Sequence, residues 1–290
     1  MPVLNKSEPS SEPSHAKEVS SGQRFEFGRN WARFLQYLND ERIRAAEESL
    51  LDMLGRESLS GLRFLDAGSG SGLFSLAARR LGAAVHSFDY DPHSVACTRE
   101  LRRRYFPACA ANDNADWKVD QASVLDSAYL SSLGTFDIVY SWGVLHHTGA
   151  MWQALENVAP LVAPGGQLFI AIYNDQGTAS RRWHTVKRLY NKYPVLRYPL
   201  LGLSTWVLWW RRWVKDLLRL RPFASWRAEQ TGRGMTRWRD MVDWVGGYPF
   251  EVAKPEQLFD FYLQRGFSLQ RMITCGGSIG CIQLVLRKGA

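Results

Sequence analysis

The stretch FLDAGSGSG at residues 64–72 decides the fold. The apolar run Arg63–Ala67 predicts a buried strand, and Leu73–Leu81 behind the glycines has helical spacing. A strand that enters a helix through a glycine turn is typical of nucleotide-binding α/β folds, where glycine lets the backbone approach a ligand closely. The dinucleotide pattern G-x-G-x-x-G fails, because its third position falls on Leu73 or Ser75. The chain instead has an acid at the end of the strand, followed by G-x-G-x-G.

The residues around this stretch alternate between the two periodicities. Helical spacing recurs over Trp31–Leu54, with Gly55 as a stop, and the pattern then predicts strands and helices in turn. The strands are Ala84–Asp89, Trp117–Val119, Phe136–Tyr140 and Gln167–Tyr173, and the helices are Pro92–Tyr105 and Met151–Val162. A later helix, Pro255–Gly266, precedes an antiparallel pair, Phe267–Ile273 and Cys281–Arg287. This order predicts an α/β fold with a mainly parallel sheet and helices on both faces.

The charge of the chain is concentrated in one segment. The 290 residues are 46% hydrophobic, which is enough for a sizeable core, and carry 36 Lys plus Arg against 28 Asp plus Glu. Between Arg181 and Asp240 there are 15 basic and 3 acidic residues, together with 7 of the 12 tryptophans. The basic character therefore belongs to this segment, and a diffuse nucleic-acid binder is not favoured. Four scattered cysteines without a C-x-x-C pair indicate neither a disulfide scaffold nor a structural zinc site.

The N-terminal residues are rich in Ser, Glu and Pro. They contain no apolar signal-peptide core, so we expect a disordered tail over residues 1–24, with a docking segment as the alternative. No clean apolar run of 18 or more residues is present, so no membrane span is predicted.

On these motifs the chain resembles the class I S-adenosylmethionine-dependent methyltransferases, whose first motif is acid-x-G-x-G-x-G at this point. The resemblance covers about Leu62–Tyr173 and implies a Rossmann-like, seven-stranded, mainly parallel sheet with S-adenosylmethionine as cofactor. Asp66 would act on the ammonium of the cofactor, usually through water in this family. The loop residues that would bind it are Gly68, Ser69, Gly70 and Gly72.

The second strand supplies the next motif, Asp89 and Tyr90. Asp89 follows Gly70 by 19 residues. An acid at this point accepts hydrogen bonds from both ribose hydroxyls. Asp91 precedes Pro92 and is expected to cap the helix that follows. The resemblance places the adenine contacts at Ser123 and Val124. Many members of the family carry an acid at the position of Ser123, so this chain departs from the pattern there.

The stretch FDIVYSWGVLHH at residues 136–147 matches the family's fourth strand and the loop that lines the methyl-transfer site. It places Ser141 at the cofactor and Trp142 at the substrate. His146 and His147 are candidate general bases, with His147 favoured, because imidazole accepts protons near neutral pH. One of them could instead cap a helix or pack under the cofactor.

Asn174 and Asp175 follow the last strong strand, at the sheet edge where open α/β folds bind ligands, and are candidate substrate contacts. His146, His147 and Asp175 could together hold a metal. The spacing in the sequence does not fix a third ligand beside the two histidines, however, so no metal site is predicted. From His146 to Asp175 the layout resembles the ubiquinone and menaquinone biosynthesis methyltransferases. This resemblance implies a small, hydrophobic or lipid-like acceptor, with O-methylation favoured.

Four parts follow from this reading: a tail at 1–24, an N-terminal helical cap at 25–60, a methyltransferase core at 61–173 and 254–290, and a large Trp/Arg-rich helical insertion at 174–253. Within the insertion one helical face is apolar, with arginines and a lysine on the other. The apolar face comprises Leu203, Trp206, Val207, Trp210, Trp213, Val214, Leu217 and Leu218. Such a helix suits a membrane interface, or a lid whose aromatic face packs on the core, or a partner or nucleic-acid surface.

Three functions stay open at this stage. The leading hypothesis is a cytoplasmic methyltransferase for a small acceptor, with peripheral contact at the inner membrane face. The alternatives are an RNA or protein methyltransferase that docks through the basic insertion, and a pseudoenzyme that binds the cofactor without turnover. For the aromatic and acidic residues at 238–251 two interpretations stay open: they line an acceptor pocket, or they only pack in the protein interior.

Overall fold

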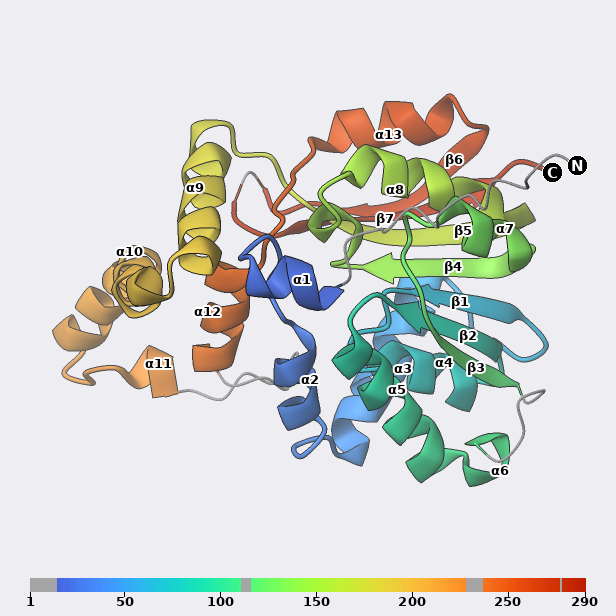
Figure 1. Cartoon of the computed structure of the whole chain (residues 1–290), viewed down its shortest axis with the longest axis horizontal. Helices are drawn as coiled ribbons and strands as arrows, with labels where there is room; N and C mark the ends of the chain where they lie inside the picture. Colours follow the sequence, from blue (N-terminus) through green and yellow to red (C-terminus); the bar gives the residue numbers. More distant parts are fainter. Residues whose placement is uncertain (1–14, 111–115, 228–236, 277) are drawn as a thin grey trace, which may run out of the picture.

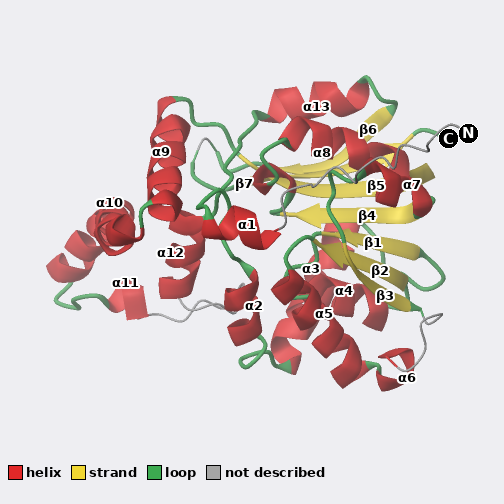
Figure 2. Cartoon of the chain, in the orientation of Figure 1, coloured by secondary structure: helices red, strands yellow, loops and turns green. Residues whose placement is uncertain are grey.

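A seven-stranded sheet in the order β3-β2-β1-β4-β5-β7-β6 forms the centre of the computed structural model, which describes residues 15–110, 116–227, 237–276 and 278–290 (Figures 1 and 2). Strands β1 to β5 are parallel, and β7 runs antiparallel to both β5 and β6. The strands are β1 (Arg63–Ala67), β2 (Ala84–Asp89), β3 (Trp117–Gln121), β4 (Phe136–Trp142), β5 (Val162–Tyr173), β6 (Phe267–Ile273) and β7 (Cys281–Lys288). The predicted Rossmann-like, mainly parallel seven-stranded sheet is confirmed.

Alternate residues of the strands supply two separate hydrophobic layers. Leu65 of β1 packs with α7 (Ser127–Ser132), α8 (Met151–Val158) and α13 (Pro255–Leu263), whereas the neighbouring Phe64 packs with α3 (Asp40–Leu54), α4 (Leu73–Arg80) and α5 (Pro92–Tyr105). Because helices cover both faces, the central strands are apolar throughout rather than alternating. The order of the strands brings the carboxyl ends of β1, β2 and β4 together, since Ala67 pairs with Phe88 and Asp66 with Tyr140.

Local sequence explains where the flanking helices begin and end. Asn39 caps α3 by accepting from the amide of Arg42 at 3.0 Å, and Gly55 ends α3 in the left-handed region at φ +64°. Asp91 caps α5 by accepting from the amide of His93 at 2.8 Å, with Pro92 in the first turn, as predicted. Strand β5 starts five residues earlier than expected, because Val162 pairs with Phe136 ahead of the Pro-Gly-Gly turn.

The expectation of a disordered tail through residue 24 is wrong for residues 15–24. They contain α1 (His15–Ser20), and His15 is buried. The physical reason is long-range: Glu18 and Arg24 find polar partners on the core that the local composition does not reveal. Residues 1–14 of the predicted tail lie outside the described residues. After α1 the chain enters the cap through α2 (Gly28–Phe34).

The insertion leaves and rejoins the sheet at adjacent positions, since Asn174 and Ala253 form an isolated parallel bridge. Its helices are α9 (Thr178–Lys192), α10 (Arg197–Leu218), α11 (Ala224–Arg227) and α12 (Arg237–Gly246). Figure 1 shows this group to the left of the sheet, beyond the ends of the strands. It has a core of its own, formed by Tyr190, Leu201, Trp209, Met241 and Val245.

The apolar face predicted for α10 points outward. Trp206 is 58% exposed and Val207 is 53% exposed, whereas Trp213 is half-buried and Trp209, on the opposite side, is buried. The hypothesis of a lid whose predicted aromatic face packs on the core is therefore wrong in that detail, because other residues of α10 make the packing contacts. No helix in the described ranges combines the length and the apolar character that a bilayer crossing requires.

Candidate active site

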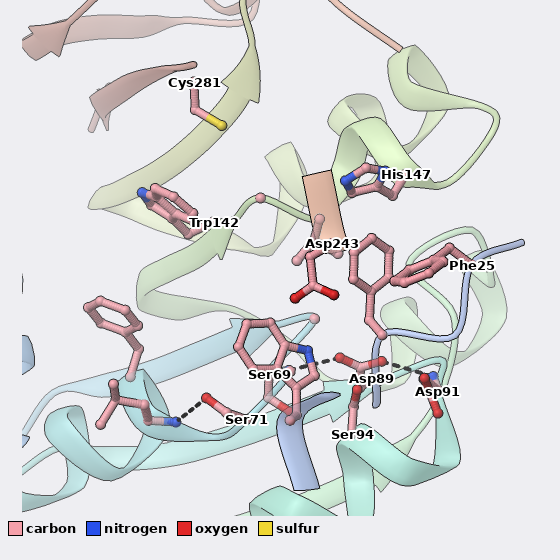
Figure 3. Close-up of a pocket in the computed structure, with 18 of the residues that line it drawn as sticks. Phe25, Ser69, Ser71, Asp89, Asp91, Ser94, Trp142, His147, Asp243 and Cys281 are labelled. Carbon is pink, nitrogen blue, oxygen red and sulfur yellow. Dashed lines mark hydrogen bonds between the residues drawn. The ribbon is translucent and has the colours of Figure 1, made fainter. Parts of the chain in front are cut away.

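A cavity of about 890 Å³ lies at the carboxyl ends of β1, β2 and β4. Three parts of the chain line it: the loops of the core, the N-terminal residues from His15 to Ser49, and the insertion through α10 and α12. Figure 3 shows its two ends, with Ser69, Asp89 and Asp91 on one side and Trp142, His147 and Cys281 toward the other.

The glycine loop after β1 forms one wall of the cavity. Gly68 and Gly70 have φ of +89° and +54°, and a Cβ on Gly68 would lie 2.3 Å from Cγ1 of Val144. Glycine is therefore required at residue 68 both by backbone conformation and by space. Gly72 was predicted to bind the cofactor, but it does not line the cavity. A Cβ there would lie 2.8 Å from Cα of Thr98, so this glycine permits the close packing of α4 against α5.

Asp66, one residue before the end of β1, has a buried carboxyl group that lines the cavity. Its Oδ2 accepts from the hydroxyl of Ser75, which in turn accepts from the hydroxyl of Ser87 at 2.8 Å. Burial raises the pKa of Asp66 to about 7, and the nearby carboxylate of Asp89 contributes in the same direction. A cationic ligand at this point would favour the ionised form of Asp66.

Asp89 is held by two backbone amides. Its Oδ2 accepts from Gly70 N at 2.9 Å and its Oδ1 accepts from Asp91 N at 2.8 Å. Burial raises the pKa of Asp89 to about 6, although both hydrogen bonds favour the carboxylate. Each carboxylate oxygen has a second lone-pair site, so the group can accept further hydrogen bonds from a diol in the cavity.

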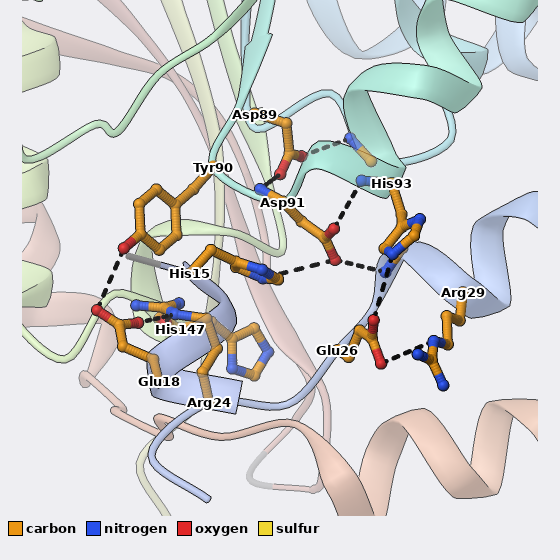
Figure 4. Close-up of polar contacts among 12 residues, drawn as sticks. His15, Glu18, Arg24, Glu26, Arg29, Asp89, Tyr90, Asp91, His93 and His147 are labelled. Atoms are coloured by element: carbon orange, nitrogen blue, oxygen red, sulfur yellow. Dashed lines mark hydrogen bonds and ion pairs between the residues drawn. The ribbon is translucent and has the colours of Figure 1, made fainter. Parts of the chain in front are cut away.

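The N-terminal segment contributes His15 and Arg24 to the lining of the cavity, and Figure 4 shows its polar contacts with the residues after β2. The hydroxyl of Tyr90 donates to Oε1 of Glu18 at 3.3 Å, and the guanidinium of Arg24 lies 4.9 Å from the centre of the Tyr90 ring. Arg24 also donates to the backbone oxygen of His147 at 2.8 Å. The sequence predicted Tyr90, which lines the cavity, but not Glu18 and Arg24, because no local pattern marks their distant partners.

The predicted adenine and serine contacts divide into two groups. Ser69, Ser123 and Val124 line the cavity, and the hydroxyl of Ser123 accepts from the amide of Leu125 at 3.1 Å. Ser141 does not line it, because its hydroxyl is buried and donates to the backbone oxygen of Ala67 at 2.7 Å. Ser141 therefore ties β4 to β1 beneath the glycine loop.

The two histidines differ in position. His147 lines the cavity, and its Nδ1 donates to the backbone oxygen of Pro249 at 2.6 Å. This hydrogen bond assigns the proton of the neutral ring to Nδ1 and leaves Nε2 as the basic nitrogen. Burial lowers the pKa of His147 to about 3. His146 does not line the cavity; it is completely buried, with its ring centre 4.0 Å from that of Tyr173.

The other end of the cavity is mainly aromatic. Trp142 lines it as predicted, and its Nε1 donates to Oε1 of Gln283 at 3.1 Å. The further aromatic residues are Phe25, Phe27, Tyr173, Trp209 and Trp244. Asp243 of α12 also lines this end, and its Oδ1 accepts a hydrogen bond from the side-chain amide of Asn30. The sequence indicates the aromatic and acidic segment at 238–251 as a candidate pocket lining, but it does not single out Asp243.

Asn174 and Asp175, predicted to contact the substrate, do not line the cavity. The amide of Asn174 donates to the backbone oxygen of Ser278 at 3.3 Å, and Oδ1 of Asp175 accepts from Gly177 N at 2.8 Å. Both side chains stabilise the entry to the insertion. No group of three or more His, Cys, Asp or Glu side chains within the described ranges is arranged to hold a metal ion.

These residues fit S-adenosylmethionine. Asp66 can pair with its ammonium, Asp89 can accept from its ribose hydroxyls, and the loop at Gly68 and Gly70 leaves no side chain in the way. Ser123 and Val124 line the same cavity.

Solved structures show the same fold at low identity. Magnesium protoporphyrin IX methyltransferase from Synechocystis PCC 6803, with bound S-adenosylhomocysteine, is 14% identical at a TM-score of 0.52, over 94% of this chain and 100% of that one. The 1,6-didemethyltoxoflavin-N1-methyltransferase from Burkholderia thailandensis is 15% identical at a TM-score of 0.50, over 98% of this chain and 93% of that one.

Curated relatives match the core. The ubiquinone biosynthesis O-methyltransferase of Sinorhizobium medicae is 31% identical over 140 residues, which is 48% of this chain and 51% of that protein. The same-named protein of Sinorhizobium fredii is 30% identical over 147 residues. The chain thus spans about half the length of the curated relatives it matches. A family model described as a methyltransferase domain matches residues 29–227, more than half of the chain, and the protein therefore belongs to this methyltransferase family.

Proposed function

We propose that the protein transfers the methyl group of S-adenosylmethionine to an oxygen of a small aromatic acceptor that carries an apolar chain. The observation that carries this proposal is the position of His147: its basic nitrogen belongs to the same cavity as Asp66, Asp89 and the glycine loop. The proposed cofactor wall and a candidate base therefore share one cavity.

The cofactor end has the groups that this donor needs. Asp89 receives the ribose hydroxyls, Asp66 balances the ammonium, and Tyr90 closes the pocket under Glu18 and Arg24. When bound, S-adenosylmethionine supplies a methyl group activated by a positively charged sulfur. The protein's own task is then to hold the acceptor oxygen in line and to keep water away.

His147 takes the proton of the acceptor hydroxyl at Nε2. Its Nδ1 hydrogen bond to Pro249 fixes the ring, and burial keeps the ring neutral at physiological pH. The positive charge of Lys187 acts in the same direction on the pKa of His147. The fixed tautomer leaves Nε2 free to accept a proton, and the lowered pKa makes His147 a weaker base than a free imidazole.

The acceptor end supports an apolar, ring-containing substrate. Trp142, Tyr173 and Trp244 provide flat apolar surfaces, and Asp243 provides a polar anchor for a hydroxyl group. The relatives named ubiquinone biosynthesis O-methyltransferase support oxygen as the methylated atom and a quinone precursor as the acceptor class. No observation favours an RNA or protein substrate or a catalytically inactive cofactor-binding protein.

The proposal includes a cytoplasmic location with peripheral contact at the inner face of the membrane. A long apolar chain on the acceptor would keep most of it in the bilayer, and the outward apolar face of α10 supports contact with that surface.

The test is transfer of a deuterated methyl group. The full chain is incubated with trideuteromethyl S-adenosylmethionine and a catechol that carries a short prenyl chain, and products are identified by mass spectrometry. We expect a labelled methoxy group on the catechol. The matched control has both hydroxyls already methylated and should take no label. An aniline with the same prenyl chain is assayed beside the catechol. Labelling of the aniline but not of the catechol would contradict O-methylation, and labelling of neither compound would contradict the proposed acceptor class.

A further inference from the structure

Helix α10 has an outward apolar stripe of seven residues. Leu203, Trp206 and Val207 recur at helical spacing with Trp210, Val214, Leu217 and Leu218, within an arc of about 120° on a helical wheel. All seven are exposed, from 41% for Trp210 to 79% for Leu218. A contiguous apolar surface of this kind on a helix indicates a partner with an apolar interior.

The opposite side of α10 explains why the stripe cannot turn inward. Leu201, Ser204, Thr205 and Trp209 are buried, and Leu201 and Trp209 belong to the core of the insertion. The helix is therefore fixed in rotation by its own packing. Tryptophan and leucine on the outward face are the residues that enter the boundary between lipid headgroups and acyl chains.

Basic side chains lie beside the stripe. Arg211, Lys215 and Arg219 are exposed, and Asp216, the acid of this helix, is buried and accepts from Ser225. The helix thus presents cations and apolar groups together and no exposed carboxylate. This combination is complementary to a bilayer that contains anionic phospholipids. A nucleic acid would pair with the cations but leave the apolar stripe in water.

The same helix also lines the cavity. Leu208, Trp209 and Arg212 of α10 contribute to its wall, and the guanidinium of Arg212 lies 4.6 Å from the centre of the Trp209 ring. One helix therefore has the outward stripe on one side and the acceptor end of the cavity on another. A molecule dissolved in the bilayer at the stripe is close to the place where it would be methylated.

We propose that the α10 stripe docks on an anionic phospholipid bilayer and that the acceptor passes from the bilayer into the cavity along α10. This inference rests on the proposed function for the identity of the acceptor, but the docking itself does not. Membrane docking then regulates turnover: acceptors held in a bilayer are methylated efficiently only by docked protein, and water-soluble analogues are methylated equally well without it.

Docking is tested by cosedimentation of the full chain with phosphatidylcholine vesicles, with and without phosphatidylglycerol. We expect strong binding only to the anionic vesicles. The double variant Trp206→Asp/Val207→Asp should reduce partitioning by about tenfold or more, because charge replaces apolar groups at the interface. The double variant Arg211→Glu/Lys215→Glu keeps the stripe and should lose the preference for anionic vesicles.

The matched control is Leu263→Asp. Leu263 is an exposed apolar residue, at 53%, on α13 of the core. The variant introduces the same charged side chain away from the stripe and should bind vesicles like the wild type. Vesicle binding at the wild-type level by the α10 variants would overturn the proposal. An equal loss of vesicle binding in Leu263→Asp and in the α10 variants would also overturn it. Binding to RNA that competes with vesicles and survives the stripe substitutions would overturn it in favour of a nucleic-acid surface.

A second readout separates this inference from the proposed function. Trp206 and Val207 do not line the cavity, so the stripe variant should methylate a short-chain, water-soluble catechol at the wild-type rate and lose activity on a long-chain catechol in vesicles. Equal activity on both acceptors would overturn the route along α10. Absence of methyl transfer by the wild type to either acceptor would contradict the proposed function, whereas the vesicle-binding result would still decide the docking.

Discussion

The backbone amide of Gly70 donates a hydrogen bond to Oδ2 of Asp89 across 2.9 Å, joining the glycine loop after β1 to the end of β2. The second oxygen of Asp89 accepts from Asp91 N, so two amides orient this carboxylate. The loop and the acid that were recognised as separate motifs in the sequence therefore form one unit. We expect ribose binding at this end of the cavity to require this unit to be intact.

Gly70→Val should abolish cofactor binding. At φ +54° a Cβ would lie 3.3 Å from Nε1 of Trp31, so a branched side chain fills the cavity and displaces the loop. Calorimetry with S-adenosylmethionine measures this loss. The control is Gly134→Val, which also has a positive φ, of +72°, but no neighbour within 4 Å of the added Cβ. The control should lose stability and keep its affinity. Wild-type affinity in Gly70→Val would count against this location for the cofactor.

Asp89→Asn should weaken S-adenosylmethionine binding by roughly 10- to 100-fold, the usual cost of replacing a charged hydrogen-bond acceptor. The amide would also present an N–H to one of the two backbone donors that Asp89 accepts from. Asp126→Asn is the matched control, because Asp126 caps α7 outside the cavity. If both variants lost affinity equally, the effect would be one of general stability and not of ribose recognition.

His147→Asn should lower kcat by about 10²- to 10⁴-fold while the dissociation constant for S-adenosylmethionine stays unchanged. The asparagine amide can still donate to Pro249, as Nδ1 does, but it has no basic nitrogen at the position of Nε2. Steady-state kinetics with the labelled donor gives kcat, and calorimetry gives the dissociation constant. His184→Asn, at an exposed histidine of α9, serves as the control. A wild-type kcat in His147→Asn would mean that positioning alone supports the transfer.

Asp66→Asn should flatten the pH dependence of stability. Burial raises the folded-state pKa of Asp66 to about 7 from an ordinary 3.8, so between about pH 4 and pH 7 the folded state binds more protons than the unfolded state. Stability therefore falls as pH rises through this window and levels off above it. Between pH 5 and pH 8 the wild type should lose roughly 2–3 kcal/mol more than the variant, measured by urea unfolding. Parallel losses would show that Asp66 is not the group responsible.

Where local chemistry was sufficient, the sequence predicted the fold closely. Strand β2 and helix α5 have the predicted bounds, because apolar alternation, the Asp91 cap and Pro92 all act within a few residues. One wall of the cavity followed from the same kind of information. Asp66, Gly68, Gly70 and Asp89 line the cavity because strand order brings the carboxyl ends of β1 and β2 together.

The remaining errors concern residues whose surroundings come from distant parts of the chain. Gly72 and Ser141 belong to the expected motifs, but they face Thr98 and Ala67 and not the cavity. Composition suggested disorder around Glu18 and Arg24, which are held by the remote groups Tyr90 and His147. Asp243 depends on the path of the whole insertion, which the sequence does not specify.

The bridge between Asn174 and Ala253 has an evolutionary consequence. Because seventy-eight intervening positions begin and end at neighbouring points of the scaffold, that stretch can be exchanged or remodelled while strand registry in the sheet stays the same. The residues proposed to recognise the methyl donor lie mostly outside the exchangeable stretch, whereas Asp243 and Trp244 lie inside it. Selection for new acceptors can thus act on one module of the gene without rebuilding the machinery for the donor.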